Sequence, residues 1–544
     1  MTTKSRRNAP AKNQNKTSNR NDAPPGSTAA QLARDIQAGR ATASQILEER
    51  LERIADAQGR LNCFVTIDAD GARATARERD LETGRGICRG PLHGVPIALK
   101  DSWATRNLRT TNGYAKTAQS APPDYDATVV ARLKAAGAVI VGKTNLSALA
   151  MDIQSDNPVA GRTNHPLDPA RTPGGSSGGA ACAVAAGLVP FDIGSDIGGS
   201  IRIPAHFCGV LGFKPTENSV SLHGHLPGLP EPDYVALRHL ASAGPIAGSF
   251  EDLRLTFDLI RGPDPHDPKI APVHSFAPAN RSKHKRARIA VLHPDRARRQ
   301  PAPGGASSNA LSLSYPIDAE YARRLDAFVE ALRRRDREFE VVELKQSPFD
   351  FDRIGALWGK LLNAGLAPLT PLPARLAMAL IGALRKRKPA GLEQIFPLGF
   401  EAFMRTLTER DAAIVDFEGF FAPADFAQDA VDPHGFDALL APVSATAAFE
   451  HTKADRVFGA SNVYTQPVNV QGADGAVFPQ EYYRAHTGYT IPFNLLGNPV
   501  VSMPIGATEA GLPLGIQVIG PRWSDLRLLD LAERLYETGR AGDS

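Results

Sequence analysis

The sequence predicts an α/β fold, with a single large domain built around a central mixed, twisted sheet that helices cover on both faces. Apolar runs of strand length, continuous at 95–99 and 138–141 and interrupted only by Asp437 at 436–441, alternate with segments of helical periodicity. Such runs are typical of strands buried on both faces beneath helices. The 544 residues are 42% apolar and 22% charged, which excludes wholesale disorder and a disulfide scaffold.

Ordered structure is expected to begin near residue 27. Residues 1–26 have almost no apolar side chains and carry a net charge of +5, so we expect a disordered basic tail. Residues 27–541 form the predicted domain. Its first helix contains Leu32 and Ile36 on one face. Thr42 and Gln45 then form a capping box that predicts a second amphipathic helix.

The remaining elements follow from short apolar runs and helical stripes. Strands are predicted at 63–67, 95–99, 138–141, 436–441, 499–503 and 515–519, and helices at 127–136, 180–187 and 524–537. Residues 277–312 interrupt this pattern with a basic cluster and a Pro- and Gly-rich stretch, so a surface excursion from the domain is predicted there. The basic cluster at 281–300 has a net charge of +7, whereas the whole chain has +4.

Four widely spaced cysteines and the lack of a secretory signal predict reduced thiols and a cytoplasmic, soluble protein. No apolar run has the roughly 18–20 residues needed to cross a membrane, so no membrane association is expected. No set of Cys and His residues has the spacing of a metal site, and no metal is predicted.

Two motifs resemble known sites but lack their structural context. Residues 137–144 match the phosphate-binding loop pattern G-x-x-x-x-G-K-[ST], yet the four intervening residues are apolar and typical of a strand. Residues 174–178 match the nucleophile elbow G-x-S-x-G, yet two prolines precede it where the elbow needs a strand. Neither a nucleotide site nor an α/β-hydrolase triad is favoured.

Two glycine-rich turns that present serine are more informative. Gly-Gly-Ser-Ser-Gly-Gly occupies 174–179 and Gly-Ser-Asp-Ile-Gly-Gly-Ser occupies 194–200, with an Ala-rich helical segment between them. Glycine lets the backbone approach a reacting group and turn several N–H groups in one direction, as an oxyanion hole requires.

With these turns the sequence resembles the amidase signature family. The resemblance extends over 194–205 and Gly-Val-Leu-Gly-Phe-Lys-Pro-Thr at 209–216, over Gly-Val-Pro-Ile-Ala-Leu-Lys-Asp at 94–101, and over 492–506 and 511–521. It covers roughly residues 27–540 and is weakest between about 275 and 430. It implies the amidase signature fold and a stand-alone amidase that needs no metal or organic cofactor.

The resemblance also implies a Ser–cis-Ser–Lys triad. Ser200 would be the nucleophile, Ser176 the proton relay after a cis bond from Gly175, and Lys100 the base. A lysine serves as a base only when neutral, so its pKa must be lowered by burial. The implied oxyanion hole is formed by the N–H groups of Ile197, Gly198, Gly199 and Ser200. Three residues are expected to support the site: Ser177 by a hydrogen bond, Asp196 and Arg202 as a buried pair.

The expected substrate is a small-molecule carboxamide or N-acyl amine. For the protein itself, the sequence leaves a homodimer open as the oligomeric state. Pocket residues are expected within 217–240, 348–430 and 444–490. The alternative is the A subunit of a tRNA-dependent amidotransferase, which acts within a complex; 145–152 departs from that subunit's usual acidic-aromatic pattern. A third hypothesis, nucleic-acid binding by the basic segments, is not favoured, because such tails are often only solvated.

Overall fold

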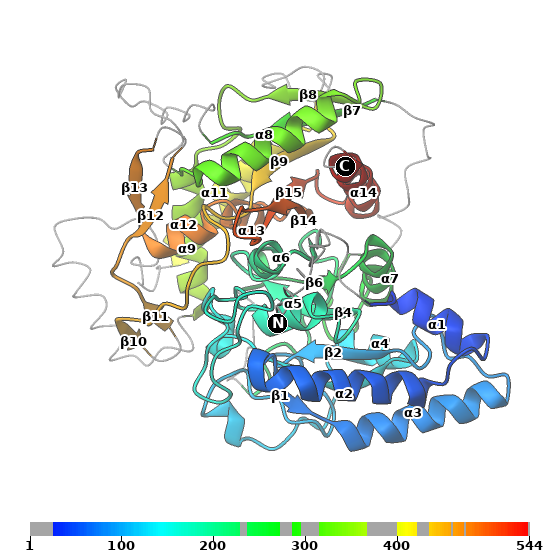
Figure 1. Ribbon diagram of the computed structural model, residues 1–544. Helices are drawn as coiled ribbons and strands as arrows, with labels where there is room; N and C mark the ends of the chain where they lie inside the picture. Colours follow the sequence, from blue (N-terminus) through cyan, green and yellow to red (C-terminus); the bar gives the residue numbers. More distant parts are fainter. Residues whose placement is uncertain are drawn as a thin grey trace, which may run out of the picture.

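The computed structural model describes residues 26–228, 237–271, 286–294, 315–366, 400–421, 435–458, 461–472 and 475–541. These residues form an eight-stranded mixed sheet and a three-stranded sheet, with helices packed around both (Figure 1). The predicted α/β class with a central mixed sheet is therefore confirmed. Residues 1–25 of the expected tail lie outside the described residues. No helix in the described ranges is both long and apolar enough to cross a membrane.

The first two helices form where the sequence places them. They are α1 (Ala29–Gln37) and α2 (Ala43–Leu61). The side chain of Thr42 accepts from the N–H of Gln45 and the side chain of Gln45 accepts from the N–H of Thr42, so the predicted capping box is present. Capping satisfies N–H groups that have no partner within the helix, which explains why this local pattern locates the helix start.

A three-stranded sheet carries the first half of the site. Its strands are β1 (Phe64–Ile67), β2 (Pro96–Lys100) and β3 (Val139–Thr144), in the order β1-β3-β2. β2 runs parallel to β3, and β1 runs antiparallel to it. The apolar runs correctly predict these strands but not their separation from the central sheet, because a buried run indicates burial on both faces and not the sheet to which it belongs.

The central sheet has the order β4-β6-β5-β14-β15-β9-β7-β8. Its strands are β4 (Phe191–Asp196), β5 (Leu211–Lys214), β6 (Ser242–Ala247), β7 (Ala287–Val291), β8 (Phe339–Glu343), β9 (Ala438–Pro442), β14 (Val500–Ala507) and β15 (Pro513–Ile519). The pairs β7–β8 and β7–β9 are parallel and the others are antiparallel.

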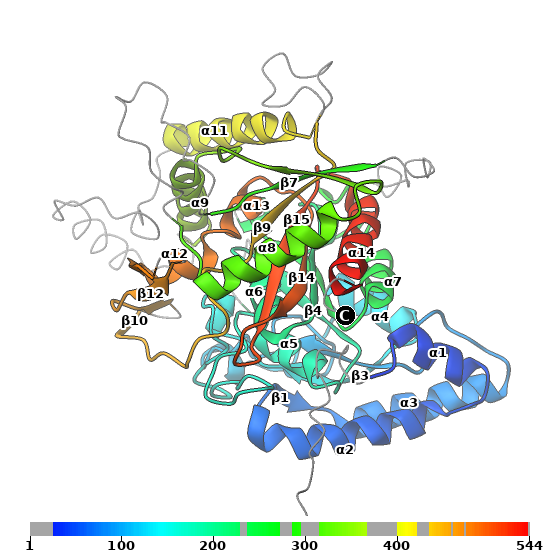
Figure 2. The same ribbon diagram turned by 45° about the horizontal axis from the view of Figure 1, so that its top comes forward.

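Helices cover both faces of this sheet. Phe213 of β5 packs edge-on against Phe257 of α7 (Phe250–Ile260). At the adjacent Gly212, an added side-chain carbon would meet Ala205 of α6 (Arg202–Cys208). Successive residues of a strand point to opposite faces, so α6 and α7 lie on opposite sides. Figure 2 shows α8 (Ala319–Arg333) crossing over β14 and β15.

One described part of the expected surface excursion at 277–312 is instead a strand of the sheet. Residues 287–291 form β7 between β8 and β9, and Ile289 is completely buried. Arg288 explains why the basic composition misleads. Its guanidinium pairs with Glu340 and lies over the ring of Phe436, so a basic residue fits within this strand. Residues 277–285 and 295–312 lie outside the described residues.

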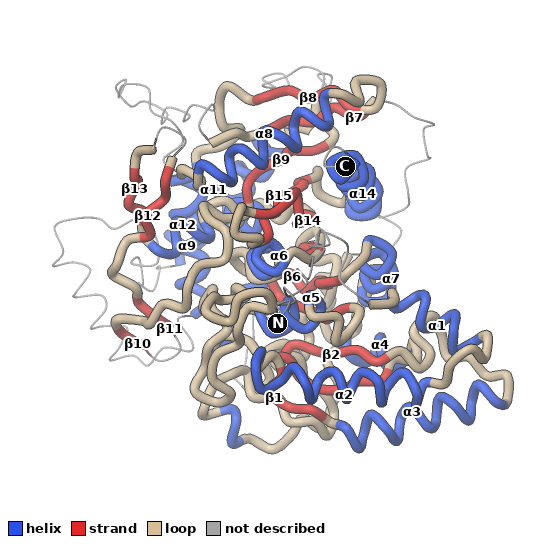
Figure 3. The backbone as a smooth tube through the Cα atoms, in the orientation of Figure 1, coloured by secondary structure: helices blue, strands red, loops and turns tan. Residues whose placement is uncertain are grey.

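The other elements complete the described chain, and much of the segment between β3 and α5 is loop (Figure 3). The further helices are α3 (Ala69–Gly84), α4 (Thr128–Ala135), α5 (Gly178–Ala185), α9 (Phe351–Leu366), α11 (Phe400–Glu418), α12 (Tyr482–Thr487), α13 (Ile491–Leu495) and α14 (Asp525–Ala541). Short 3-10 helices span Thr117–Gln119, Ala148–Ala150 and Leu237–His239. Two small hairpins pair β10 (Arg456–Phe458) with β11 (Ser461–Val463) and β12 (Val468–Gln471) with β13 (Val477–Gln480).

Candidate active site

The candidate site lies where the end of β2 meets β4 and the loop that precedes α5. The backbone N–H of Lys100 donates to Asp192 Oδ1 of β4 over 2.9 Å, and Thr144 Oγ1 of β3 donates to Asp192 Oδ2 over 2.8 Å. These bonds join the small sheet to the edge of the central sheet. Burial raises the pKa of Asp192 to about 6, although the hydrogen bonds from Thr144 and the backbone oppose this shift.

Lys100 occupies the interior of this junction. Its side chain is completely buried, and its Nζ donates to Ser176 Oγ over 2.7 Å and to Ser195 Oγ over 3.0 Å. Burial lowers the pKa of Lys100 to about 7, against the opposing charges of Asp196 and Asp192. A large fraction of this amine is therefore neutral near pH 7, as a general base requires.

Ser176 and Ser177 behave differently although they are neighbours. The Gly175–Ser176 peptide bond is cis, and Ser176 contacts Lys100. Ser155 holds this loop, because its hydroxyl lies 3.0 Å from the carbonyl oxygen of Gly174 and 3.1 Å from that of Ser176. The expectation that the Ser177 hydroxyl forms a hydrogen bond is wrong in this structure, since its buried Oγ has no partner among the described residues. A carbon added to Gly194 would lie 3.0 Å from this oxygen, so the hydroxyl faces a residue without a side chain.

Ser200 follows β4 in the turn that leads into α6. It is half-buried, unlike Lys100 and Ser176, so it is the most exposed of the three residues. The N–H of Ser177 donates to the carbonyl oxygen of Ser200 over 3.2 Å, which brings the two glycine-rich turns together. Lys100 and Ser176 are joined by a hydrogen bond. The Ser200 hydroxyl forms no hydrogen bond within the described chain, so none links it to Ser176.

The turn from Asp196 to Ser200 contains the predicted oxyanion donors. The N–H groups of Ile197, Gly198 and Ser200 have no acceptor among the described residues. The N–H of Gly199 instead donates to Asp196 Oδ1 over 2.8 Å. The expectation that Gly199 donates to the oxyanion is therefore corrected. A hydrogen bond to a buried carboxylate is strong, and it leaves Gly199 no free N–H hydrogen.

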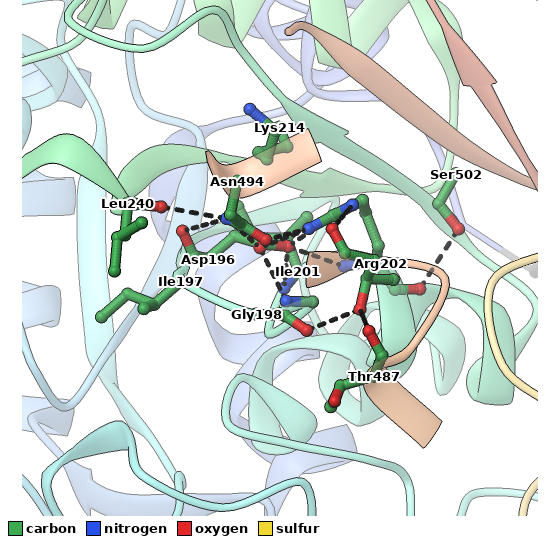
Figure 4. A network of polar contacts seen from close by, with 12 residues as sticks. Asp196, Ile197, Gly198, Ile201, Arg202, Lys214, Leu240, Thr487, Asn494 and Ser502 are labelled. Carbon is green, nitrogen blue, oxygen red and sulfur yellow. Dashed lines mark hydrogen bonds and ion pairs between the residues drawn. The ribbon is translucent and has the colours of Figure 1, made fainter. Parts of the chain in front are cut away.

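Asp196 and Arg202 form the expected buried pair at the base of this turn (Figure 4). Both side chains are completely buried, with 2.8 Å between Arg202 Nη2 and Asp196 Oδ1. Burial alone would raise the pKa of Asp196, but the Arg202 guanidinium and the surrounding hydrogen bonds hold it below its usual value. Asp196 also accepts from the N–H of Gly199 and Ile201, so a permanently charged carboxylate closes the turn.

Several residues that contact this network are missing from the prediction. Asn494 donates to both the carboxylate and the backbone carbonyl of Asp196 over 2.9 and 3.0 Å, and it is labelled beside Asp196 in Figure 4. Gln517 accepts from Arg202 over 2.7 Å. Both lie about 300 residues further along the chain. Ser195 could have been found, because it lies inside the second glycine-rich turn. Asn494 and Gln517 lie within the family-like stretches 492–506 and 511–521, but nothing local in those stretches indicates contact with Asp196 or Arg202.

The two look-alike motifs have the structures that the sequence favours. Residues 139–144 of the phosphate-loop pattern form β3, and Lys143 is buried with its amine 3.0 Å from Thr105 Oγ1. No strand stands directly before Ser176, because residues 172–175 form loop. The structure therefore supports neither a phosphate-binding loop nor a nucleophile elbow at these two positions.

Comparison with known proteins identifies the family of this chain. The family model described as Amidase matches residues 45–349 and 401–529. The A subunit of a glutamyl-tRNA(Gln) amidotransferase from Acidothermus cellulolyticus (strain ATCC 43068 / DSM 8971 / 11B) is 33% identical, over 94% of this chain and 93% of the relative. A solved structure described as "Crystal structure of amidase" is 28% identical with a TM-score of 0.68, over 93% of this chain and 98% of that one.

A further solved chain comes from work described as "An unexpected vestigial protein complex reveals the evolutionary origins of an s-triazine catabolic enzyme". It is 27% identical with a TM-score of 0.69, over 94% of this chain and 99% of that one. The fold and the matched residues define a hydrolase that acts on C–N amide bonds. The chain belongs to the amidase family, the amidase signature enzymes.

Proposed function

We propose that this chain is an amidase that hydrolyses a carboxamide or N-acyl amine to a carboxylate and ammonia or an amine. One observation carries the proposal. Lys100 is completely buried, has its pKa lowered to about 7 by that burial, and lies 2.7 Å from Ser176 Oγ, while the next residue, Ser177, bonds the carbonyl of the half-buried Ser200. A neutral amine, a bridging hydroxyl and an accessible hydroxyl are the groups that base-assisted acyl transfer to serine needs.

Acylation would begin with Ser200 Oγ attacking the amide carbonyl carbon. Ser176 takes the Ser200 proton while its own proton moves to the lone pair of neutral Lys100. The carbonyl oxygen becomes an oxyanion, which the N–H groups of Ile197, Gly198 and Ser200 would stabilise. The C–N bond then breaks, and the leaving nitrogen takes the proton back through Ser176. Ammonia or an amine departs, and an acyl ester with Ser200 remains.

Hydrolysis of the ester would use the same groups. Water adds to the acyl carbon while its proton passes through Ser176 to Lys100. When the C–O bond to Ser200 breaks, the proton returns to Ser200 Oγ, and the product leaves as a carboxylic acid that loses its proton to solvent and becomes the carboxylate. The full cycle consumes one amide and one water, and every residue regains its starting protonation state.

Labelling with a fluorophosphonate tests the nucleophile directly. The wild-type chain should incorporate one label in the peptide that contains Ser200, and Ser200→Ala should lose both label and hydrolysis. Ser120→Ala replaces an exposed serine remote from these turns and should retain both. Ammonia release from propionamide and benzamide, and 4-nitroaniline release from 4-nitroacetanilide, measure activity. Substantial turnover by folded Ser200→Ala would refute the assignment.

The second candidate is the A subunit of a tRNA-dependent amidotransferase. The observation that favours it is the 33% identity to a relative that bears that name, over nearly the whole of both chains. Such a subunit would hydrolyse glutamine to supply ammonia within a complex. Glutaminase activity that appears only when partner subunits are added would support this candidate. Hydrolysis of simple amides by the isolated chain would favour the stand-alone amidase.

A cytoplasmic location and a homodimer also stay proposals. The four cysteines are free thiols, of which three are buried, and this supports a reducing compartment. Sedimentation of the purified full chain would distinguish a monomer from a dimer.

A further inference from the structure

Trp358 reaches the candidate oxyanion turn from a part of the chain that the family model does not match. It lies on α9, between the matched ranges that end at 349 and resume at 401. Its indole Nε1 donates to the carbonyl oxygen of Ile197 over 2.8 Å. The ring also packs on the neighbouring glycine, because a carbon added to Gly198 would lie 3.3 Å from Trp358 Cζ2.

The first three carbonyls of this turn are each held by a different side chain. Asn494 donates to the carbonyl oxygen of Asp196 over 3.0 Å, and Trp358 donates to that of Ile197. Thr490 Oγ1 lies 2.5 Å from the carbonyl oxygen of Gly198 and donates to it. Three donors from two segments, α9 and the first turn of α13 with its N-cap Thr490, therefore fix three consecutive peptide groups.

The direction of each N–H follows from the planar trans peptide. The C=O of one residue and the N–H of the next point in opposite directions, so a held carbonyl also orients that N–H. The bond from Thr490 to the Gly198 carbonyl fixes the direction of the Gly199 N–H, which donates to the Asp196 carboxylate. The bond from Trp358 to the Ile197 carbonyl fixes the direction of the Gly198 N–H, which has no acceptor among the described residues.

We propose that Trp358 is a positioning residue for amide hydrolysis, which it serves by directing the Gly198 N–H at the oxyanion that forms on attack by Ser200. This inference rests on the function proposed above. Trp358 would not touch the reacting atoms, and its effect would pass through one peptide group. Charge on the oxyanion is largest in the tetrahedral intermediate, so a misdirected donor weakens the transition state more than the bound substrate.

Trp358→Phe keeps an aromatic ring on α9 and removes the N–H donor. Loss of a direct oxyanion donor lowers kcat by about 10²–10³-fold, so for this indirect donor we expect a fall of about 10–100-fold. KM for the best amide substrate should stay within about threefold, since ground-state binding does not use the oxyanion. The second-order rate of fluorophosphonate labelling should fall by the same factor as kcat.

Trp523→Phe is the matched control. Trp523 is partly exposed and lies next to Arg522, outside the turn between β4 and α6. It should leave kcat and labelling unchanged. If Trp358→Phe does not fold, benzothienylalanine at position 358 offers the same bicyclic shape with sulfur in place of the N–H, and the same losses are expected.

Two results would separate the inference from the function beneath it. Wild-type kcat and labelling rate in a folded Trp358→Phe chain would overturn the positioning role and leave the amidase proposal intact. A fall in kcat together with a rise in KM and a lower melting temperature would also overturn it, because that pattern indicates a purely structural role. Undiminished turnover by Ser200→Ala would instead overturn the proposed function.

Discussion

Lys100 is the residue whose protonation should set the pH dependence of activity. Burial lowers its folded-state pKa to about 7, so the amine is charged below this pH and neutral above it. A charged ammonium cannot accept a proton from Ser176. We therefore expect kcat/KM to fall about tenfold per pH unit below pH 7 and to level off above it. A pH–rate profile for the best amide substrate measures this.

Lys214 provides the control for that assignment. It is also completely buried, burial lowers its pKa to about 7, and its Nζ donates to the carbonyl oxygen of Pro215 and not to a serine. A Lys214→Met chain that retains activity should keep the acidic limb of the profile. Movement of the limb in this variant would transfer the titration to Lys214 and contradict the role of Lys100.

The adjacent serines Ser176 and Ser177 make a second test at the scale of residues. Ser176 contacts the amine of Lys100, whereas the buried hydroxyl of Ser177 has no partner among the described residues. Ser176→Ala should lower kcat by about 10³-fold or more. Ser177→Ala removes an unpaired polar group, so the free energy of unfolding should stay constant or rise by up to about 1 kcal/mol. Equal activity losses in both variants would contradict this distinction.

The turn between β4 and α6 depends on the Asp196–Arg202 pair. Arg202→Met would leave the Asp196 carboxylate buried without its counter-ion, and breaking such a pair costs about 3–5 kcal/mol. Denaturant unfolding should show this loss. The double variant Asp196→Asn with Arg202→Met removes the unpaired charge and should recover part of the stability. A double variant less stable than Arg202→Met would contradict this explanation.

Elements and site residues with local signals could be predicted from the sequence, and those made by distant contacts could not. The Thr42–Gln45 capping box locates α2 because its hydrogen bonds join residues three apart. The apolar runs locate β2 and β3, and the glycine-rich turns locate Ser176 and Ser200. β7 is missed because basic residues surround its short apolar core, and its pairing with β8 and β9 joins segments that are distant in the sequence.

Trp358 and Asn494 show the same limit within the site. Trp358 lies 161 residues from its partner Ile197, and the Asn494 amide lies 298 residues from Asp196. Neither occurs in a motif whose spacing indicates the turn that it holds. Their contribution appears only when α9 and α13 pack beside β4, so the structure adds the residues that orient the site to those that the motifs predict.

Charge divides the whole molecule into two kinds of segment. The net +4 combines +5 near the N-terminus and +7 at 281–300 with an excess of acidic residues elsewhere. Lys100, Ser176 and Ser200 all lie outside the two basic segments. Overall basicity is therefore a poor guide to the chemistry of the substrate, because the charge is concentrated away from the residues proposed to act on it.

The N-terminal basic segment should be dispensable for folding and hydrolysis. The first described contacts to the body come from Thr28 and Ala29, which bond the side chains of Glu251 and Asp252 on α7 over 3.0 and 2.9 Å. A chain without residues 1–25 keeps these bonds, so its melting temperature should stay within about 2 °C and its kcat/KM within about twofold. Its retention on a cation exchanger should fall, because it loses net positive charge. A salt-sensitive RNA or DNA mobility shift present in the full chain and absent from the shortened one would instead support nucleic-acid binding by this segment.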